Sequence, residues 1–437
     1  MKKLLCVLLL IIILCPFLTG CDEKTSKNTL TVYVQNRSNR SDIEAVNAKY
    51  KTLYPNVTLR FFELESLDWK SLKAKLHTEL MSGRGPDILI LNPNLFGDIN
   101  KAMQAGAFCD LNEFLRNDAE YNADNYYQNV LSAGKYKDKQ YVMPLSFNVP
   151  VLMTTQHMLK KSEFNPDNCN DYQGYISEVV KFIEKSKKGN GTFSLLGYNT
   201  DPPSFLQYIE TNMFDYKDRI IDLKIDELRQ ICLDYKIYHH YRNTENEIVS
   251  WELGDVYNYL SQEKILFDCA GMNDSASDLF INAAMLNVNN VPVLLPIKDT
   301  QGRLNVEVTS IAAISNTCEN KQNAYNYMKL LISPTVQATY PQNPVLKSAL
   351  TDNIKLAKEQ FKTGYLEDLG NAPVKPLNDS FYQGYLEIIE SIDGAQFNNV
   401  EVNKIFYLAI EPYLNHKKSL DDCLKQAQDQ LEIYISE

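Results

Sequence analysis

The chain reads Thr-Leu-Thr-Val-Tyr-Val at residues 29–34, Val-Thr-Leu-Arg-Phe-Phe at 57–62 and Asp-Ile-Leu-Ile-Leu at 87–91. These runs are rich in β-branched and aromatic residues, which is typical of strands. The third run is almost wholly apolar, as expected for a central parallel strand that is covered on both faces. Helix-like segments separate the three runs, and this β-α-β-α-β order predicts a doubly wound α/β sheet.

The two connecting segments carry clear helix signals. The first begins with Ser-Asp-Ile-Glu at residues 41–44, a capping box, and ends before Pro55. The second has apolar residues at helical spacing from Trp69 to Leu80 and ends at Gly83. Further along the chain, the same signals predict helices at 172–185, 226–241, 323–333 and from 419 onward, and strands at 140–144, 265–267, 291–296 and 306–314.

A ligand of such a sheet lies beyond the carboxyl ends of the strands. Asn36 and Arg37 follow the first strand, Glu63 follows the second and Asn92 follows the third. Amide groups can bond paired hydroxyls, and a guanidinium can hold a carboxylate or phosphate in a forked geometry. We therefore predict that these residues contact a ligand, with ordinary turn chemistry as the alternative for the asparagines.

The amino terminus has the pattern of an exported, lipid-modified protein. A basic start at residues 1–3 precedes an apolar run at 4–14, which is too short to span a bilayer. Leu-Thr-Gly-Cys at 18–21 then matches the bacterial lipobox, in which the Cys21 thiol accepts a diacylglyceryl group. We predict a signal peptide at residues 1–20, a lipidated polar tether at 21–28 and a location on the outer side of the cell membrane.

Composition narrows the function further. The chain has 437 residues, a formal net charge of −11 and 44% hydrophobic residues, so wholesale disorder and nucleic-acid binding are disfavoured. The length suits two domains or more. The count of 27 Tyr suits a wet binding surface, with a Tyr-rich core as the alternative.

No residue pattern indicates catalysis, a metal or a cofactor. The chain lacks G-x-S-x-G, H-E-x-x-H and phosphate-loop motifs. His239 and His240 are adjacent, and neighbours on a helix point about 100° apart, so we do not expect them to share an ion. We expect buried thiols, or one adventitious disulfide, at the cysteines after the tether: Cys109, Cys169, Cys232, Cys269, Cys318 and Cys423.

Several ordered segments resemble a known family. They are Leu-Met-Ser-Gly-Arg-Gly-Pro-Asp-Ile at 80–88, Phe-Cys-Asp-Leu-Asn-Glu-Phe at 108–114, Gly-Lys-Tyr-Lys-Asp-Lys-Gln-Tyr-Val-Met-Pro at 134–144, Ala-Tyr-Asn-Tyr-Met-Lys-Leu-Leu-Ile-Ser at 324–333, Pro344-Val345 and the closing helix at 419–437. Behind a lipobox, this set resembles family 1 of the extracellular solute-binding proteins, the maltose-binding-like sugar-binding lipoproteins of ABC importers.

The resemblance implies a two-lobe α/β periplasmic-binding-protein fold of type II, in which each lobe is a sheet flanked by helices and crossing strands form a hinge. Lobe one would hold residues 29–146 and 272–315, and lobe two would hold 147–271 and 316–437. The lobes would close on a solute, which requires that the solute bind the closed form more tightly than the open form.

The resemblance also adds contact residues in the cleft. Phe147 and Asn148 would lie at the first crossing, where an aromatic ring could stack on a pyranose or simply pack in the hinge. Trp251 could be a sugar platform or a core residue, and Met272 and Asn273 follow Gly271 at the second crossing. Thr309 and Ser310, which precede an apolar run, are further candidates.

We therefore expect a monomeric, lipid-anchored solute-binding protein that delivers an oligosaccharide to the permease subunits of an ABC importer and performs no chemistry. A surface receptor that signals the presence of ligand is one alternative. A glycan-processing enzyme is another, and it would need a pair of carboxylates at a fixed separation.

Overall fold

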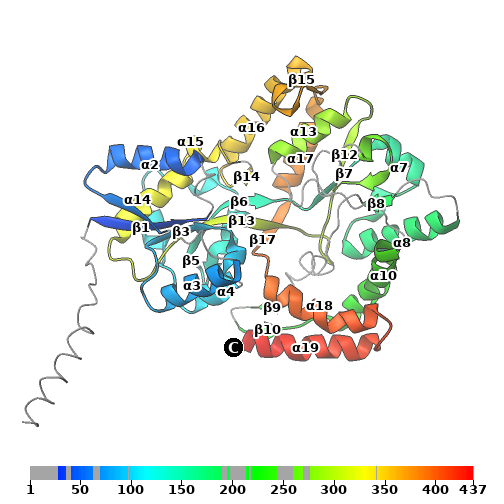
Figure 1. Cartoon of the computed structure of the whole chain (residues 1–437), viewed down its shortest axis with the longest axis horizontal. Helices are drawn as coiled ribbons and strands as arrows, with labels where there is room; N and C mark the ends of the chain where they lie inside the picture. The colour runs from blue at the N-terminus through cyan, green and yellow to red at the C-terminus, as the bar shows by residue number, and fades with distance from the viewer. Residues whose placement is uncertain are drawn as a thin grey trace, which may run out of the picture.

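The computed structural model describes residues 28–35, 41–62, 69–96, 98–188, 194–196, 213–215, 218–244, 259–268, 276–340 and 342–436. A sheet at one end of the molecule extends through long strands into the middle, and helices occupy the other end (Figure 1). No helix in the described ranges is both long and apolar enough to cross a membrane.

The main sheet has seven strands within the described residues, in the order β14-β6-β13-β3-β1-β2, with β17 also paired to β13. Their bounds are Thr29–Val34 (β1), Thr58–Phe62 (β2), Ile88–Leu91 (β3), Val142–Asn148 (β6), Leu304–Ile314 (β13), Asn343–Pro344 (β14) and Ile392–Gln396 (β17). Strand β1 pairs in parallel with both β2 and β3, which confirms the doubly wound arrangement predicted from the sequence.

The predicted helices flank this sheet. Helix α2 (Ser41–Leu53) buries Ile43, Val46 and Tyr50, and α3 (Trp69–Met81) follows β2. Helix α14 (Lys321–Leu331) packs on α2, where the Tyr50 hydroxyl donates to the Asn323 carbonyl at 3.0 Å and the two rings Tyr50 and Tyr327 meet edge to face at 5.2 Å. These tyrosines belong to the core and not to a binding surface.

Strand β6 extends further than the sequence predicts. The expected strand closes at Pro144, but Pro144 lies within β6, opposite Ile311 of β13. Proline cannot donate a ladder hydrogen bond, so it normally ends a strand or sits at an irregularity. Here the register shifts between Ser310 and Ile311, and this bulge accommodates the proline.

The remaining elements surround these strands. The helices are α4 (Ile99–Gln104), α5 (Asn112–Asn117), α6 (Gln128–Leu131), α7 (Gln156–Ser162), α8 (Tyr172–Lys188), α10 (Ile225–Thr244), α13 (Ala276–Leu286), α15 (Pro334–Gln337), α16 (Lys347–Gln360), α17 (Asp379–Glu390), α18 (Val400–Leu414) and α19 (Leu420–Ser436). The short strands are β4 (Lys135–Tyr136), β5 (Lys139–Gln140), β7 (Val151–Thr155), β8 (Ser194–Leu196), β9 (Phe214–Asp215), β10 (Ile220–Ile221), β11 (Ile265–Phe267), β12 (Pro292–Pro296), β15 (Tyr365–Leu366) and β16 (Ala372–Pro373).

Two hydrophobic clusters divide these elements. The first contains the main sheet together with α2, α13, α14 and α16, and the second contains α8, α10, α18 and α19. Residues 316–437, which the sequence-based boundary assigns to lobe two, divide between the clusters: buried residues from Cys318 to Phe397 belong to the first and those from Val402 onward to the second. The physical reason is that α14 buries its apolar face on α2 and β13, so the chain passes to the second cluster only after β17. The lobe boundaries themselves stay a prediction.

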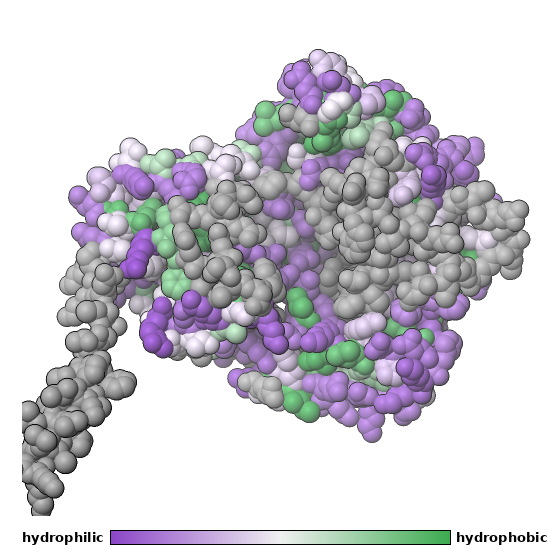
Figure 2. Space-filling model, in the orientation of Figure 1, coloured by the Kyte–Doolittle hydropathy of each residue, from purple (hydrophilic) through white to green (hydrophobic). Residues whose placement is uncertain are grey.

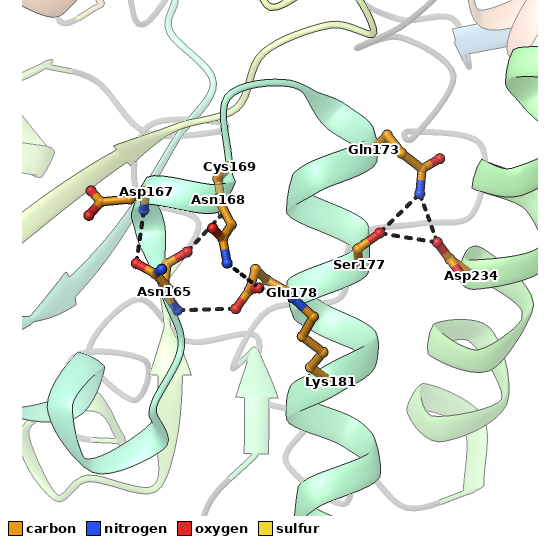
Figure 3. A network of polar contacts seen from close by, with 9 residues as sticks. All are labelled: Asn165, Asp167, Asn168, Cys169, Gln173, Ser177, Glu178, Lys181 and Asp234. Atoms are coloured by element: carbon orange, nitrogen blue, oxygen red, sulfur yellow. Dashed lines mark hydrogen bonds and ion pairs between the residues drawn. The ribbon is translucent and has the colours of Figure 1, made fainter.

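A buried carboxylate holds a turn against helix α8 in the second cluster. Glu178 of α8 is 4% exposed and accepts hydrogen bonds from the Asn165 N–H at 3.2 Å and the Asn168 amide at 2.7 Å (Figure 3). Burial alone raises the pKa of Glu178, but the hydrogen bonds from Lys181, Asn168 and Asn165 outweigh it and hold the pKa below its usual value. Glu178 thereby holds the turn η6 (Pro166–Asn168) against α8.

Replacing Glu178 by Gln should lower the free energy of unfolding by roughly 1–3 kcal/mol, because buried donors lose their charged acceptor. The loss should be measured by denaturant unfolding near pH 7. Because the folded pKa is depressed, the stabilisation is complete above the ordinary glutamate pKa and disappears as pH falls through the folded value. The gap between variant and parent should therefore shrink in acid.

Glu184 is exposed on the same helix and provides the matched control. Glu184→Gln should leave stability within about 0.5 kcal/mol of the parent. Equal effects of the two substitutions would contradict the role assigned to Glu178.

Candidate functional site

The candidate site lies on one face of β13, whose other face packs in the core. Val306 and Val308 are fully buried in the first hydrophobic cluster, while Asn305, Glu307 and Thr309 alternate with them and are partly buried. Successive side chains of a strand point to opposite faces. The strand therefore presents a polar row of three side chains on the face turned away from the core.

The ends of two strands point toward each other beside this polar row, with residues 308–310 of β13 between their pairings. Strand β3 runs antiparallel to β13 and ends with Leu91 opposite Ile311, whereas β17 runs parallel to β13 and ends with Gln396 opposite Glu307. The carboxyl ends of β3 and β17 therefore face each other along the middle of β13. The segments that leave these ends carry Asn94, in the turn η3 (Pro93–Leu95), and Asn398.

Glu307 lies where these segments converge. The side chains of Asn94 and Asn398 both hydrogen-bond to its carboxyl group, and on the other side of β13 its strand partner is Asn148 of β6. Burial raises the pKa of Glu307 to about 7, and the hydrogen bonds from Asn398 and Asn94 offset only part of this effect. Within the described residues, no charged side chain acts on this carboxyl group.

The groups around Glu307 are amides and hydroxyls. The Ser146 and Thr309 hydroxyls are 2.9 Å apart, and the Asn403 amide donates to Asn398 Oδ1 at 2.9 Å. Asn94 Oδ1 is buried and has no hydrogen-bond partner in the described part of the chain. Buried polar atoms normally find a partner, so an open acceptor at this position suits a hydroxyl-bearing ligand.

A cavity of about 490 Å³ lies between two groups of helices, and its lining includes Phe96, two residues after Asn94. It is lined on one side by α3, by α4 and by residues that precede α4, including Lys73, Phe96 and Asp98, and on the other by α18 and α19, including Glu401 and Tyr434. Figure 2 shows the surface hollowed between these two parts of the molecule. Volumes of this size are ordinary for small-molecule sites.

Polar contacts join the two sides of the cavity, and we call them the clasp: Lys73, Asp98, Lys101, Asn399, Glu401 and Tyr434. Asp98 Oδ2 accepts from the Tyr434 hydroxyl at 2.8 Å and from the Asn399 amide at 3.0 Å. The Lys101 ammonium lies 3.8 Å above the Tyr434 ring, and Lys73 pairs with Glu401 at 3.0 Å.

The clasp crosses between the two hydrophobic clusters. Helix α4 packs in the first cluster through Ile99 and Met103, whereas α18 and α19 pack in the second. Asn399 directly follows Asn398 in the chain, so the clasp and the Glu307 site share one connecting segment. Burial, and after it the Asp98 carboxylate, raise the pKa of Tyr434, so its hydroxyl remains a donor throughout the neutral range.

The structure brings some of the predicted site residues together. Asn148 and Thr309 lie beside Glu307 as described above, and Ser310 follows at the bulge with its hydroxyl buried and without a partner among the described residues. Asn92 caps η3, with its Oδ1 accepting from the Asn94 N–H at 2.9 Å, which is the turn chemistry named as the alternative.

Phe147 is placed differently from its expected stacking role. Its ring is fully buried and packs edge to face with Tyr127 at 5.8 Å, because the β6 side chains on that face join the first cluster. Asn36, Arg37, Glu63, Trp251, Met272, Asn273 and the lipobox Cys21 lie outside the described residues.

Sequence reasoning missed Glu307, Asn94, Asn398 and the clasp. An acid between valines in a strand is typical of a solvent-exposed strand face. The sequence around Glu307 therefore does not indicate a buried carboxyl group or a binding site. In the described ranges no cluster of His, Cys, Asp and Glu could hold a metal, and Cys109, Cys169, Cys232, Cys318 and Cys423 are free, buried thiols.

Comparison with known proteins adds an independent observation. The family model described as bacterial extracellular solute-binding protein matches residues 45–363. No curated protein matches the chain by sequence.

Solved structures share the fold at low identity. A putative oligosaccharide periplasmic-binding protein from Synechococcus sp. MITs9220 superposes with a TM-score of 0.63 at 16% identity, over 93% of this chain and 99% of that one. An ABC substrate-binding protein from Listeria monocytogenes in complex with cycloalternan gives 0.60 at 12%, over 93% and 99%. The cyclic alpha-maltosyl-1,6-maltose binding protein from Arthrobacter globiformis gives 0.59 at 14%, over 93% and 98%. These matches show the two-lobe periplasmic-binding-protein fold expected from the sequence.

Removing the Tyr434 hydroxyl by Tyr434→Phe should weaken the clasp while keeping the ring under Lys101. A hydrogen bond to a charged group contributes about 1.5–3 kcal/mol, so the relative population of the arrangement in which the clusters are joined should fall by roughly tenfold to 100-fold. Spin labels at the exposed residues Thr78 and Ile433 would report this change as a longer, broader distance distribution.

Tyr365→Phe is the matched control, because Tyr365 is 44% exposed and lies far along the chain from the clasp. Identical distance distributions for Tyr434→Phe and the parent would show that the hydroxyl does not hold the two clusters together.

Proposed function

The chain belongs to the bacterial extracellular solute-binding proteins, and from this premise we propose that it is the lipid-anchored binding component of an ABC importer for an oligosaccharide. The choice of solute rests on the polar face of β13, where the side chains near Glu307 carry amide and hydroxyl groups. A sugar presents many hydroxyl groups that both donate and accept, and such a surface can match them.

The solved structures with this fold support the same solute class. One is in complex with cycloalternan, one has mannotriose bound, and one is a binding protein for cyclic alpha-maltosyl-1,6-maltose. Family membership also favours capture over the glycan-processing alternative.

Delivery would use movement between the two hydrophobic clusters. Two of the passages from the first cluster into the second, after β6 and after β17, lie beside Glu307. A solute held by this polar row and by the facing helices would favour the joined arrangement, and its differential affinity for that arrangement sets the extent of the change. The membrane permease would then recognise the joined form.

Attachment to the membrane rests on the amino-terminal sequence. Leu-Thr-Gly-Cys at residues 18–21 follows a basic start and an apolar run, and acylation of Cys21 would add chains that hold the protein on the membrane surface. The polar residues 22–28 would separate the anchor from the first strand.

A thermal-shift panel of neutral oligosaccharides, uronides, polyols and peptides tests the solute class. A sugar present at 100 times its Kd adds about 2.7 kcal/mol to the free energy of unfolding, which raises the melting temperature measurably. Stabilisation by peptides alone would refute the sugar assignment, and turnover of any glycan by the purified protein would refute pure binding.

Cys21→Ser should abolish lipid attachment, because a hydroxyl cannot replace the thiol as the acceptor. In a bacterial host, the parent should partition into the detergent phase and incorporate labelled fatty acid, while the variant should do neither. Cys269→Ser controls for loss of an unrelated thiol. Retention of the label in the Cys21 variant would overturn the anchor.

A further inference from the structure

We propose that Glu307 is a specificity-determining residue that makes the site reject acidic sugars and accept neutral ones. This inference rests on the proposed function as an oligosaccharide-binding protein and deepens it by naming the charge class of the solute. It follows from what surrounds the carboxyl group, element by element.

Each element packed against Glu307 supplies an amide side chain. Strand β6 places Asn148 opposite it, β17 places Gln396 opposite it, and Asn94 and Asn398 from the two converging segments hydrogen-bond to it. The next polar side chains along β13 are Asn305 and Thr309. Among the described residues, the carboxyl group therefore has neutral partners on every side.

A carboxylate in such a setting has consequences for the solute. Among the described residues, amide N–H groups stabilise its charge and no cation neutralises it. A solute hydroxyl can donate to the carboxylate, which adds a charge-assisted hydrogen bond. A solute carboxylate would instead bring a second negative charge into a site of reduced dielectric constant, where like charges repel strongly.

The protonation state of Glu307 provides a test of this charge repulsion within the parent protein. Burial raises the pKa of Glu307 to about 7, so the group is ionised at pH 8.5 and neutral at pH 5.5. A sugar uronate stays ionised at both values, because its own pKa lies far lower. Rejection of acidic sugars should therefore be strong at high pH and should fade as the pH decreases through 7.

Matched trisaccharide pairs that differ only at C6 test the inference. We suggest β-1,4-mannotriose with β-1,4-trimannuronate, and cellotriose with its C6-oxidised form, measured by titration calorimetry on the full mature chain. For the parent at pH 8.5, the uronate should bind about tenfold more weakly than its neutral partner, or worse. At pH 5.5 this ratio should fall at least several-fold.

Glu307→Gln keeps the shape and removes the charge, so the ratio of the two affinities should be nearly the same at both pH values. Glu319→Gln, an exposed acid beyond the end of β13, is the matched control and should keep the parent's pH dependence. If the Gln variant fails to fold, the pH dependence of the parent still decides the question.

Failure of this inference and failure of the proposed function give different results. A parent that binds the neutral and acidic partners equally at pH 8.5, or whose preference does not change with pH, overturns the inference and leaves sugar binding in place. If neither member of any pair binds and the wider sugar panel also fails, the proposed function is refuted and the inference with it. A parent preference that Glu307→Gln abolishes establishes the role of the carboxyl group.

Discussion

The structure depends on one long strand, β13, that must satisfy two environments at once. Its valines complete the first hydrophobic cluster, while the alternating positions carry Asn305, Glu307 and Thr309. No single strand flanks β13 along that edge, because β3 pairs with its carboxyl half and β17 with its amino half. The junction between β3 and β17 leaves room for two polar segments, and the amides of Asn94 and Asn398 converge there on one carboxyl group.

This junction links solute contact to the arrangement of the two clusters. Asn398 bonds Glu307, and its neighbour Asn399 caps α18 while donating to Asp98 across the cavity. A buried polar network is costly when only partly satisfied, so a solute that completes the bonds at Glu307 would also steady the segment that bears the clasp. Capture and closure would then use the same few residues of connecting chain.

The tyrosines show how composition can mislead. Many of them are core residues whose hydroxyls reach specific partners: Tyr126 donates to the Ile332 carbonyl at 3.1 Å, Tyr327 to Asn47 at 2.7 Å and Tyr385 to Asn343 at 2.6 Å. Such rings add apolar area and then need a partner for the hydroxyl. In the described ranges, the Tyr-rich core is therefore the better explanation for these residues than a wet binding surface.

The local pattern was enough to predict β1, β3, the capped helix α2 and the parallel pairing of the first three strands, because apolar periodicity and capping act over a few residues. Asn148 and Thr309 were candidates from their positions at the first crossing and before an apolar run; the structure places both near Glu307, and their contact with a solute stays a prediction. Glu307 was not a candidate, because its environment is made by β17 and by Asn398, which lie far away in the sequence. The same holds for the passage between clusters: α14 continues to pack on α2, and only the tertiary structure decides that β17 carries the chain across. Long-range pairing sets the burial of a charge and the course of the chain, and no short stretch of sequence contains that information.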